Sequence, residues 1–257
     1  MNGTVYLVGA GPGAVDLLTL RAANLLQRAD IMFHDALVNP EIVSLAPNAV
    51  RIAVGKRCGK HSTAQKFINK RLVDAAAAHS VVVRLKGGDP MLFGRAQEEI
   101  AALEAAGVRY EVVPGVTAAL AAAAQIGTSL TQRGSVRSVT FVTPRVGDDE
   151  GAGGWAASLA AADSGAIYMG ARQADAIAAA LMESGTPGSM PIAVVESASL
   201  PNARTIFTTL AALPRLANQA LSGPALILIG PQFHPRAERA ADVETDRHPL
   251  VLREAMG

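Results

Sequence analysis

Short apolar runs alternate with longer Ala- and Leu-rich segments along most of the chain, which is typical of an α/β protein. In the first half the pattern predicts strands at residues 4–8, 31–34, 51–54, 81–86 and 109–113, and helices at 20–29, 64–79 and 96–106. In the second half it predicts an alanine-rich helix at 117–125, strands at 138–143, 166–169, 192–196, 205–208 and 225–229, and helices at 172–184 and 209–218. The fold class is therefore α/β.

The two consecutive series of elements predict two domains. They meet near Pro114 and Gly115, so we expect domains at 1–114 and 115–235. The segment 147–154 is glycine-rich and acidic and is interpreted as a surface loop, and the charge-alternating tail 236–257 is predicted to be disordered. Ligands commonly bind where two such domains meet.

Composition narrows the class of protein. The chain has 257 residues, 50% of them hydrophobic, and can bury a large core. The single cysteine, Cys58, and the lack of a charged-then-apolar leader predict a cytoplasmic location. A net charge of +1 without long runs of like charge argues against nucleic-acid binding. The uncharged stretch 112–132 is broken by proline and glycine, which argues against a membrane span, and no ligand spacing indicates a metal site.

A glycine-rich loop follows the first predicted strand. Residues 9–14 fit the G-x-G-x-x-G/A pattern of dinucleotide-binding proteins, and Asp35 lies roughly 20 residues further on. Two details argue against a nicotinamide site: Pro12 has no N–H to offer a phosphate, and Thr19 is the first good helix N-cap, which leaves 11–18 as a loop. A tight turn without a ligand also fits this segment.

Two further loops carry candidate chemistry. In the run 84–95, Gly87 and Gly88 allow a ligand to approach the backbone and Asp89 can accept hydrogen bonds, although an Asp-Pro turn explains the same residues. The segment 51–61 holds four cationic side chains and one histidine without an acid, which suits carboxylates or phosphates. A solvated loop is the alternative for that segment.

Taken together, these loops resemble the tetrapyrrole (corrin and porphyrin) methyltransferases, from about Val5 to Gly230. The matching segments are 8–13 with Leu18 and Thr19, the Asp35 strand end, 54–57 with Gly59, His61 and Gln65, 84–95, 113–119, 130–131 with Arg133, 168–170 and 224–226. Within the family, the Gly-Lys-Arg loop and the run 84–95 look like the branch that methylates uroporphyrinogen III.

The resemblance implies a two-domain tetrapyrrole methylase fold, of the class III methyltransferases, with S-adenosyl-L-methionine in the interdomain cleft. The residues that match the cofactor contacts of the family are Pro12, Gly87, Gly88, Asp89, Leu92, Thr117, Ala118, Met169, Ala198 and Ala225. S-adenosyl-L-homocysteine would be the product of the cofactor. The family also implies a homodimer.

The implied reaction is the transfer of two methyl groups to uroporphyrinogen III, giving precorrin-2 for sirohaem and cobalamin synthesis. Asp35 matches the proposed general base of the family and Lys56 its proposed proton donor. Because the substrate carries several carboxylates, we expect cationic contacts from Arg57, Lys60, His61, Arg84, Arg95 and Arg133. Only methyltransferase activity is expected, because the resemblance covers no dehydrogenase or ferrochelatase module.

Some positions depart from the family pattern. Ala96 and Gln97 replace two glycines, Gln132 replaces a histidine, and Pro144 with Arg145 replaces Gly-His. These changes affect the substrate side and leave a corrin methylase of different ring specificity open. A nicotinamide-dependent oxidoreductase and a tetrapyrrole-binding protein without turnover are the alternatives from other classes.

Overall fold

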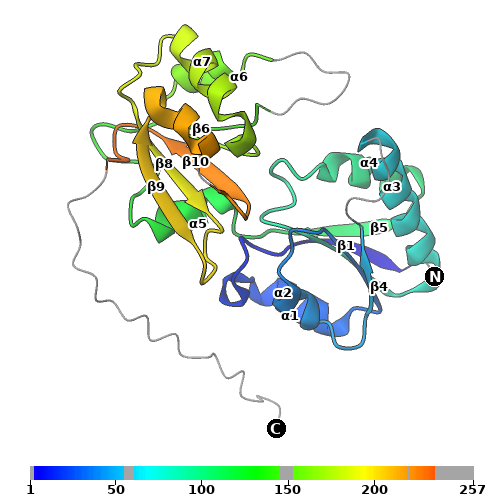
Figure 1. The fold of residues 1–257 in the computed structure, drawn as a ribbon. Helices are drawn as coiled ribbons and strands as arrows, with labels where there is room; N and C mark the ends of the chain where they lie inside the picture. Colours follow the sequence, from blue (N-terminus) through cyan, green and yellow to red (C-terminus); the bar gives the residue numbers. More distant parts are fainter. Residues whose placement is uncertain (1–2, 55–60, 145–152, 219, 235–257) are drawn as a thin grey trace.

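The computed structural model describes residues 3–54, 61–144, 153–218 and 220–234. The described chain forms two five-stranded sheets, one in each half of the sequence (Figure 1). The α/β class predicted from the apolar pattern is confirmed.

The first sheet is parallel throughout. Its strands are β1 (Thr4–Gly9), β2 (Ile31–His34), β3 (Val50–Ala53), β4 (Val81–Lys86) and β5 (Arg109–Val113), in the order β3-β2-β4-β1-β5. Helices α1 (Leu20–Arg28) and α2 (Pro40–Ser44) cover one face, and α3 (His61–Ala78) and α4 (Ala96–Ala105) cover the other (Figure 1). Because all five strands run the same way, the loops that follow them gather at one edge.

The second sheet is mixed. Its strands are β6 (Val139–Val142), β7 (Ser164–Ile167), β8 (Pro191–Glu196), β9 (Arg204–Thr209) and β10 (Ala225–Ile229), in the order β6-β7-β10-β8-β9. Strand β10 runs antiparallel to both β7 and β8, so the start of β10 lies beside their carboxyl ends. This places three connecting segments at one edge of the second sheet as well.

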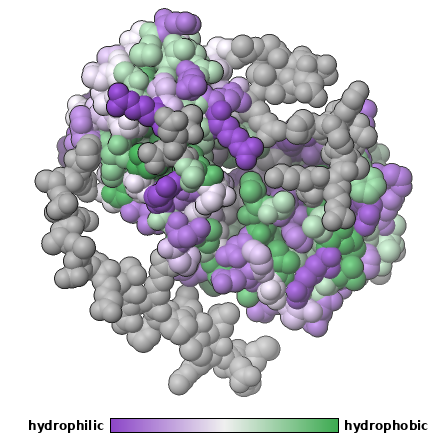
Figure 2. Space-filling model, in the orientation of Figure 1, coloured by the Kyte–Doolittle hydropathy of each residue, from purple (hydrophilic) through white to green (hydrophobic). Residues whose placement is uncertain are grey.

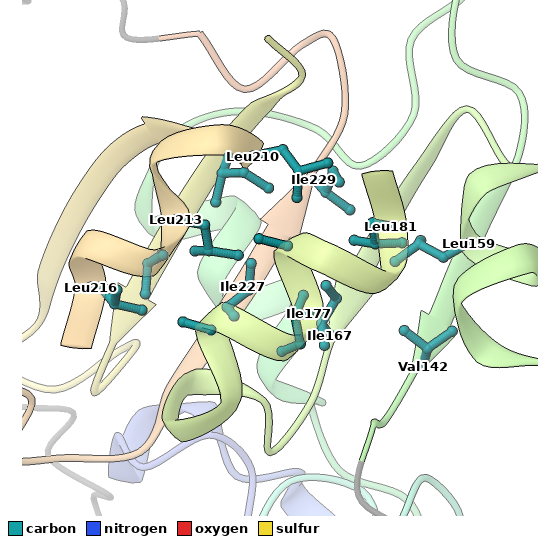
Figure 3. Packing of buried hydrophobic residues seen from close by; sticks show 14 residues of the cluster. Val142, Leu159, Ile167, Ile177, Leu181, Leu210, Leu213, Leu216, Ile227 and Ile229 are labelled. Atoms are coloured by element: carbon teal, nitrogen blue, oxygen red, sulfur yellow. The ribbon is translucent and has the colours of Figure 1, made fainter. Parts of the chain in front are cut away.

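Buried aliphatic side chains hold helices against the second sheet. Helix α5 (Ala118–Gln125) packs on one face, and α6 (Trp155–Ala160), α7 (Ala174–Glu183) and the 3₁₀ segment η3 (Leu210–Asn218) lie on the other. Figure 3 shows Ile177 of α7 and Leu213 of η3 beside Ile227 of β10. These three side chains are fully buried, so this face is a closed core rather than a ligand surface.

The remaining surface of the described residues is mixed in character. Figure 2 shows hydrophilic and hydrophobic residues interspersed over the visible face of both halves. Exposed large apolar side chains occur on several elements, including Leu20 on α1, Leu120 on α5 and Met182 on α7. Among the described residues, no helix combines the length and the apolar composition needed to cross a membrane.

Most predicted elements are confirmed, and β2, β4, β5 and β10 have the predicted bounds. The strand predicted at 166–169 is displaced, because Met169 has a φ of 57°, which ends the extended backbone. The helix predicted at 209–218 is a 3₁₀ segment with Pro214 inside it.

Several short elements were not predicted: η1 (Val15–Leu17), α2, α6 and η2 (Ala171–Gln173). The start of α2 carries a recognisable signal, since Asn39 accepts a hydrogen bond from Glu41 N and Pro40 occupies the first turn. Most of the loop predicted at 147–154 and all of the tail predicted at 236–257 lie outside the described residues. The domain boundary at 114–115 stays a prediction, although every strand of the first sheet precedes it and every strand of the second follows it.

Three glycines bring loops of the first sheet together at close range. A Cβ atom added to Gly9 would lie 2.6 Å from the nitrogen of Gly115 and 2.8 Å from the carbonyl oxygen of Gly88. The loops after β1, β4 and β5 therefore touch backbone to backbone, and Gly115 N also donates to Asp89 Oδ2 at 2.9 Å. Only glycine fits at the first of these positions without displacing the chain.

The close approach at Gly9 predicts that two glycine-to-alanine substitutions differ in their effect on stability. Gly9→Ala should lower the free energy of unfolding by about 1–3 kcal/mol, because the new methyl group overlaps backbone atoms that cannot move aside cheaply. Gly154→Ala is the matched control, since its Cβ would meet nothing within 4 Å. Urea denaturation of both variants measures the difference, and equal losses would contradict the close approach.

Candidate active site

The loops after β1 and β4 are bound to one another by their backbones. Ala10 N donates to the carbonyl of Lys86 at 2.7 Å, and Gly11 and Gly88 exchange N–H···O bonds of 3.1 and 2.7 Å. Both Gly11 and Gly88 have positive φ angles, of 70° and 67°, which glycine adopts without strain. The glycine-rich loop and the run 84–95 therefore lie side by side.

The start of α1 separates this loop from a dinucleotide site. The helix begins at Leu20, where Thr19 accepts a hydrogen bond from Ala22 N at 3.2 Å, and η1 occupies Val15–Leu17. The prediction that the glycines do not open a helix is confirmed. A pyrophosphate could not meet the first turn of α1 as it does in the dinucleotide-binding fold.

Loops of the second half contact these two loops, and the region of contact is called the junction below. Ser199 Oγ accepts a hydrogen bond from Ala14 N at 3.1 Å, and the side chain of Leu200 packs against Gly13, where a Cβ atom would lie 3.0 Å from it. On the other side, the rings of Phe93 and Tyr168 lie 5.1 Å apart. The edges of the two sheets thus meet through their loops.

Tyr168 is the most connected side chain at this junction. Its hydroxyl shares a 2.7 Å hydrogen bond with Thr117 Oγ1 and accepts from Ala119 N at 3.1 Å. Burial raises the pKa of Tyr168, against the opposing effect of its bonds to Thr117 and Ala119, so the hydroxyl stays protonated at neutral pH. Together with Phe93, it fixes the first turn of α5 relative to the loop after β4.

Unfavourable backbone conformations are concentrated in the same loops. Among the described residues, the non-glycine residues with positive φ are Phe93, Arg95, Met169, Ser197 and Ser199. All of them lie in the segments after β4, β7 and β8. Strained backbone of this kind is commonly found at ligand-binding sites, where the surrounding structure holds it in place. The observation singles out the junction without reference to any motif.

A buried network of charges lies behind the loop edge of the first sheet. Arg84 donates from Nη2 to Asp35 Oδ1 at 2.6 Å and from Nε to Glu99 Oε1 at 2.9 Å. Lys86 Nζ lies 3.0 Å from Glu99 Oε2, and Gln65 Nε2 donates to Glu99 Oε1 at 3.2 Å. The side chain of Glu99 is fully buried and those of Arg84 and Lys86 are 3% and 4% exposed, whereas that of Asp35 is 34% exposed.

The electrostatics of the network follow from its burial. Burial acts to lower the pKa of Arg84, but the carboxylates of Glu99 and Asp35 outweigh it and the pKa of the guanidinium is raised. Burial and the charge of Arg84 lower the pKa of Lys86, with Glu99 acting in the opposite direction. Removing one partner of a buried ion pair typically costs about 3–5 kcal/mol. Such a network is expensive to assemble, which suggests that it serves more than stability.

The residues predicted to contact a cofactor come together at the junction. They lie after β1 (Pro12), after β4 (Gly87, Gly88, Asp89 and Leu92), at the start of α5 (Thr117 and Ala118), after β7 (Met169), after β8 (Ala198) and at the start of β10 (Ala225). Ser197 N donates to the carbonyl of Pro224 at 2.8 Å, which holds the last two segments side by side. Their role as cofactor contacts stays a prediction.

Asp89 already has partners for both carboxylate oxygens. Oδ1 accepts from Met91 N at 2.8 Å, as expected for the Asp-Pro turn that was the alternative interpretation, and Oδ2 accepts from Gly115 N. Gly87, in contrast, is exposed and a Cβ there would meet nothing within 4 Å. Asp89 therefore shapes the loop, and Gly87 leaves an open approach to its backbone.

The residues predicted on the substrate side are only partly described. Asp35 follows β2 at the loop edge, Arg95 is 42% exposed and pairs with Glu98 at 2.6 Å, and Arg133 lies in the exposed turn after α5. Arg84 was predicted to contact substrate, but the structure directs its guanidinium to Asp35 and Glu99. Lys56, Arg57, Lys60 and Arg145 lie outside the described residues, as does the side chain of His61.

Sequence reasoning missed four residues of the site: Gln65 as a contact, Lys86, Glu99 and Tyr168. Arg84 and Lys86 stand two residues apart in an otherwise apolar strand, so they point to the same face. A buried cation requires a carboxylate partner, and that requirement could have directed attention to the predicted helix containing Glu99. No comparable signal marks Tyr168, whose partners come from a helix far along the chain.

An apolar groove away from the junction is an alternative ligand site. An apolar groove of about 460 Å³ lies between α5 and β6 and is lined by Leu120, Ala123, Ala124, Gly127, Thr128, Ser129, Leu130, Thr131, Val139 and Phe141. It has no charged side chain and none of the strained loops, so we favour the junction. Within the described residues, no group of three or more His, Cys, Asp or Glu side chains is placed to hold a metal ion.

Comparison with known proteins identifies the family. Residues 4–214 match the family of tetrapyrrole (corrin/porphyrin) methylases. The chain belongs to this family. The resemblance inferred from the loop motifs is thereby confirmed, and the nicotinamide interpretation of residues 9–14 is set aside.

Individual relatives of this methylase are similar over most of the chain. A uroporphyrin III C-methyl transferase from Thermus thermophilus is 38% identical, with a TM-score of 0.78, 89% of this chain and 98% of that chain being covered. A structure of the Thermus protein in complex with S-adenyl homocysteine has a TM-score of 0.76, at 37% identity, covering 89% of this chain and 92% of that one.

A siroheme synthase from Chromobacterium violaceum is 46% identical over 230 residues, which are 89% of this chain and 49% of that protein. The methylase thus spans about half the length of the curated relatives it matches. The predicted α/β fold of the tetrapyrrole methylases is confirmed by the solved structures, whereas its division into domains at 114–115 stays a prediction.

The hydrogen bonds of Tyr168 predict a measurable contribution to stability. Tyr168→Phe should lower the free energy of unfolding by about 1 kcal/mol, because Ala119 N and Thr117 lose a partly buried partner. Tyr110→Phe is the matched control, since its hydroxyl donates to the exposed carboxylate of Glu104. Equal effects of the two changes in urea denaturation would rule out this role of the Tyr168 hydroxyl.

Proposed function

We propose that this methylase transfers two methyl groups from S-adenosyl-L-methionine to uroporphyrinogen III, giving precorrin-2 and S-adenosyl-L-homocysteine. The observation that carries the proposal is that the ten predicted cofactor positions lie at the facing loop edges of the two sheets, six of them in the strained segments after β4, β7 and β8. The likeness to a Thermus protein named uroporphyrin III C-methyl transferase, over nearly all of that chain, supports the same substrate.

The residues at the junction suit such a cofactor. Bound there, S-adenosylmethionine would supply an electrophilic methyl group on its sulfonium sulfur. Exposed Gly87 leaves its backbone open to polar parts of a ligand, and exposed Met169 and Phe93 offer apolar surface at the same junction. The protein would contribute mainly by positioning two reactants and excluding water, because an electron-rich pyrrole carbon needs no covalent nucleophile.

Asp35 is proposed as the general base. When a new carbon–carbon bond forms to the methyl group, the carbon–sulfur bond breaks and the macrocycle must lose a proton. The carboxylate of Asp35 is 34% exposed at the loop edge and can accept that proton. Lys56 is proposed as the proton donor on the basis of the family motif.

Cationic side chains are proposed to bind the carboxylates of the macrocycle. Arg95 and Arg133 are exposed, and Arg57, Lys60 and His61 are proposed on the basis of the motif. We also propose a homodimer and a cytoplasmic location. These two proposals rest on the family resemblance and on the single cysteine.

The reaction is tested by incubating the purified protein with radiolabelled S-adenosylmethionine and anaerobically prepared uroporphyrinogen III. We expect two labelled methyl groups per macrocycle and a product identified as precorrin-2. Transfer only to later corrin intermediates would assign the methylase to another ring position, and cofactor binding without any transfer would support the tetrapyrrole-binding alternative.

The proposed roles predict different losses in three variants. Asp35→Ala and Lys56→Ala should slow methyl transfer by a factor of about 100 or more, with little change in the Kd for S-adenosylhomocysteine, because these side chains act on protons. Asp89→Ala should instead raise that Kd, because it releases Gly115 N and Met91 N from the loop that carries Gly87 and Gly88. Isothermal titration and single-turnover transfer separate the two effects. An equal loss of binding in all three variants would contradict this division.

A further inference from the structure

The buried charge network is accessible to solvent mainly at one residue. Of its four charged side chains, only that of Asp35 is substantially exposed, at 34%, whereas those of Arg84, Lys86 and Glu99 are between 0% and 4% exposed. The network therefore reaches solvent, and any ligand bound at the loop edge, through the carboxylate of Asp35.

The network brings two basic side chains together with two acidic ones. Arg84 and Lys86 contribute two positive charges, and Glu99 supplies one negative charge that both of them share. Glu99 Oε1 accepts from Arg84 Nε, Lys86 Nζ and Gln65 Nε2, so this carboxylate has no capacity to neutralise a second cation fully.

The geometry requires a guanidinium at position 84. Its Nε and Nη2 atoms reach two carboxylates on different elements, Glu99 on α4 and Asp35 after β2, while Nη1 donates to the carbonyl of Leu85 at 3.3 Å. A lysine could keep the charge but not span both acceptors, because its ammonium is a single point. The side chain of Asp35 is thus held by a planar donor that is itself fixed by Glu99.

We infer that Arg84 and Glu99 are positioning residues for the base of the reaction: Glu99 anchors Arg84, and Arg84 holds the Asp35 carboxylate in the orientation that receives the proton. The inference rests on the proposed function, since it assigns Asp35 the role of base. It replaces the expectation that Arg84 binds a carboxylate of the substrate.

A double-mutant cycle tests this inference. Arg84→Lys should lower kcat for methyl transfer by a factor of about ten or more, while KM for uroporphyrinogen III and the Kd for S-adenosylhomocysteine change by less than about threefold. In the Asp35→Ala background the same substitution should change kcat by less than about twofold, because there is no carboxylate left to position. Arg21→Lys is the matched control, since Arg21 forms an exposed ion pair with Glu111 on the edge strand β5, and it should leave kcat unchanged.

A second variant tests the inference independently of any folding defect in Arg84→Lys. Gln65→Met removes a donor to Glu99 without changing any charge, and it should lower kcat by about threefold or more in the wild-type background and not in Asp35→Ala. Additive effects in either cycle, or a raised KM for uroporphyrinogen III with unchanged kcat in Arg84→Lys, would overturn the inference alone. Absence of methyl transfer by the wild-type protein would overturn the proposed function and this inference with it.

Discussion

The contact among Gly9, Gly88 and Gly115 packs the loops after β1, β4 and β5 into the surface that faces the second half of the molecule. No side chain separates their backbones, so the loops after β1, β4 and β5 form one continuous surface of peptide groups. Asp89 reinforces it by accepting a hydrogen bond from Gly115 N. Because the first sheet is parallel, this contact also gathers the ends of its strands opposite the second sheet, where Tyr168, Ser199 and Leu200 complete the junction.

The junction and its surroundings combine two features that raise the free energy of the folded state. Non-glycine residues such as Met169 and Ser199 have positive φ angles there, and Glu99 is a fully buried carboxylate close behind it. Each cost is compensated locally, by the packing of the facing loops and by Arg84, Lys86 and Gln65 respectively. Strained residues and buried charges that are stabilised in this way are expected where a site holds groups in one arrangement. A methylase that aligns two bulky reactants needs such a site.

The sequence predicted a large part of this structure. The apolar periodicity located the ten strands and the longer helices of the described residues, whereas the use of the glycine-containing loops as a ligand site stays a prediction. The late start of α1 at Leu20 also followed from sequence, because Thr19 caps a helix by a local hydrogen bond. The short elements α2 and α6 were missed because elements of five or six residues carry little periodicity.

By itself, the sequence determined which segments are buried, which loops contain glycine and which family the chain belongs to, because these properties depend on residue type and local spacing. Only the tertiary structure decided the partners of the charged residues. Asp35 and Arg84 are 49 positions apart and become neighbours through the pairing of β2 with β4, while Glu99 reaches Arg84 from a helix on the sheet. A cationic side chain looks the same in a sequence whether it faces solvent, a substrate or a buried carboxylate, since its role is set by the elements that pack around it.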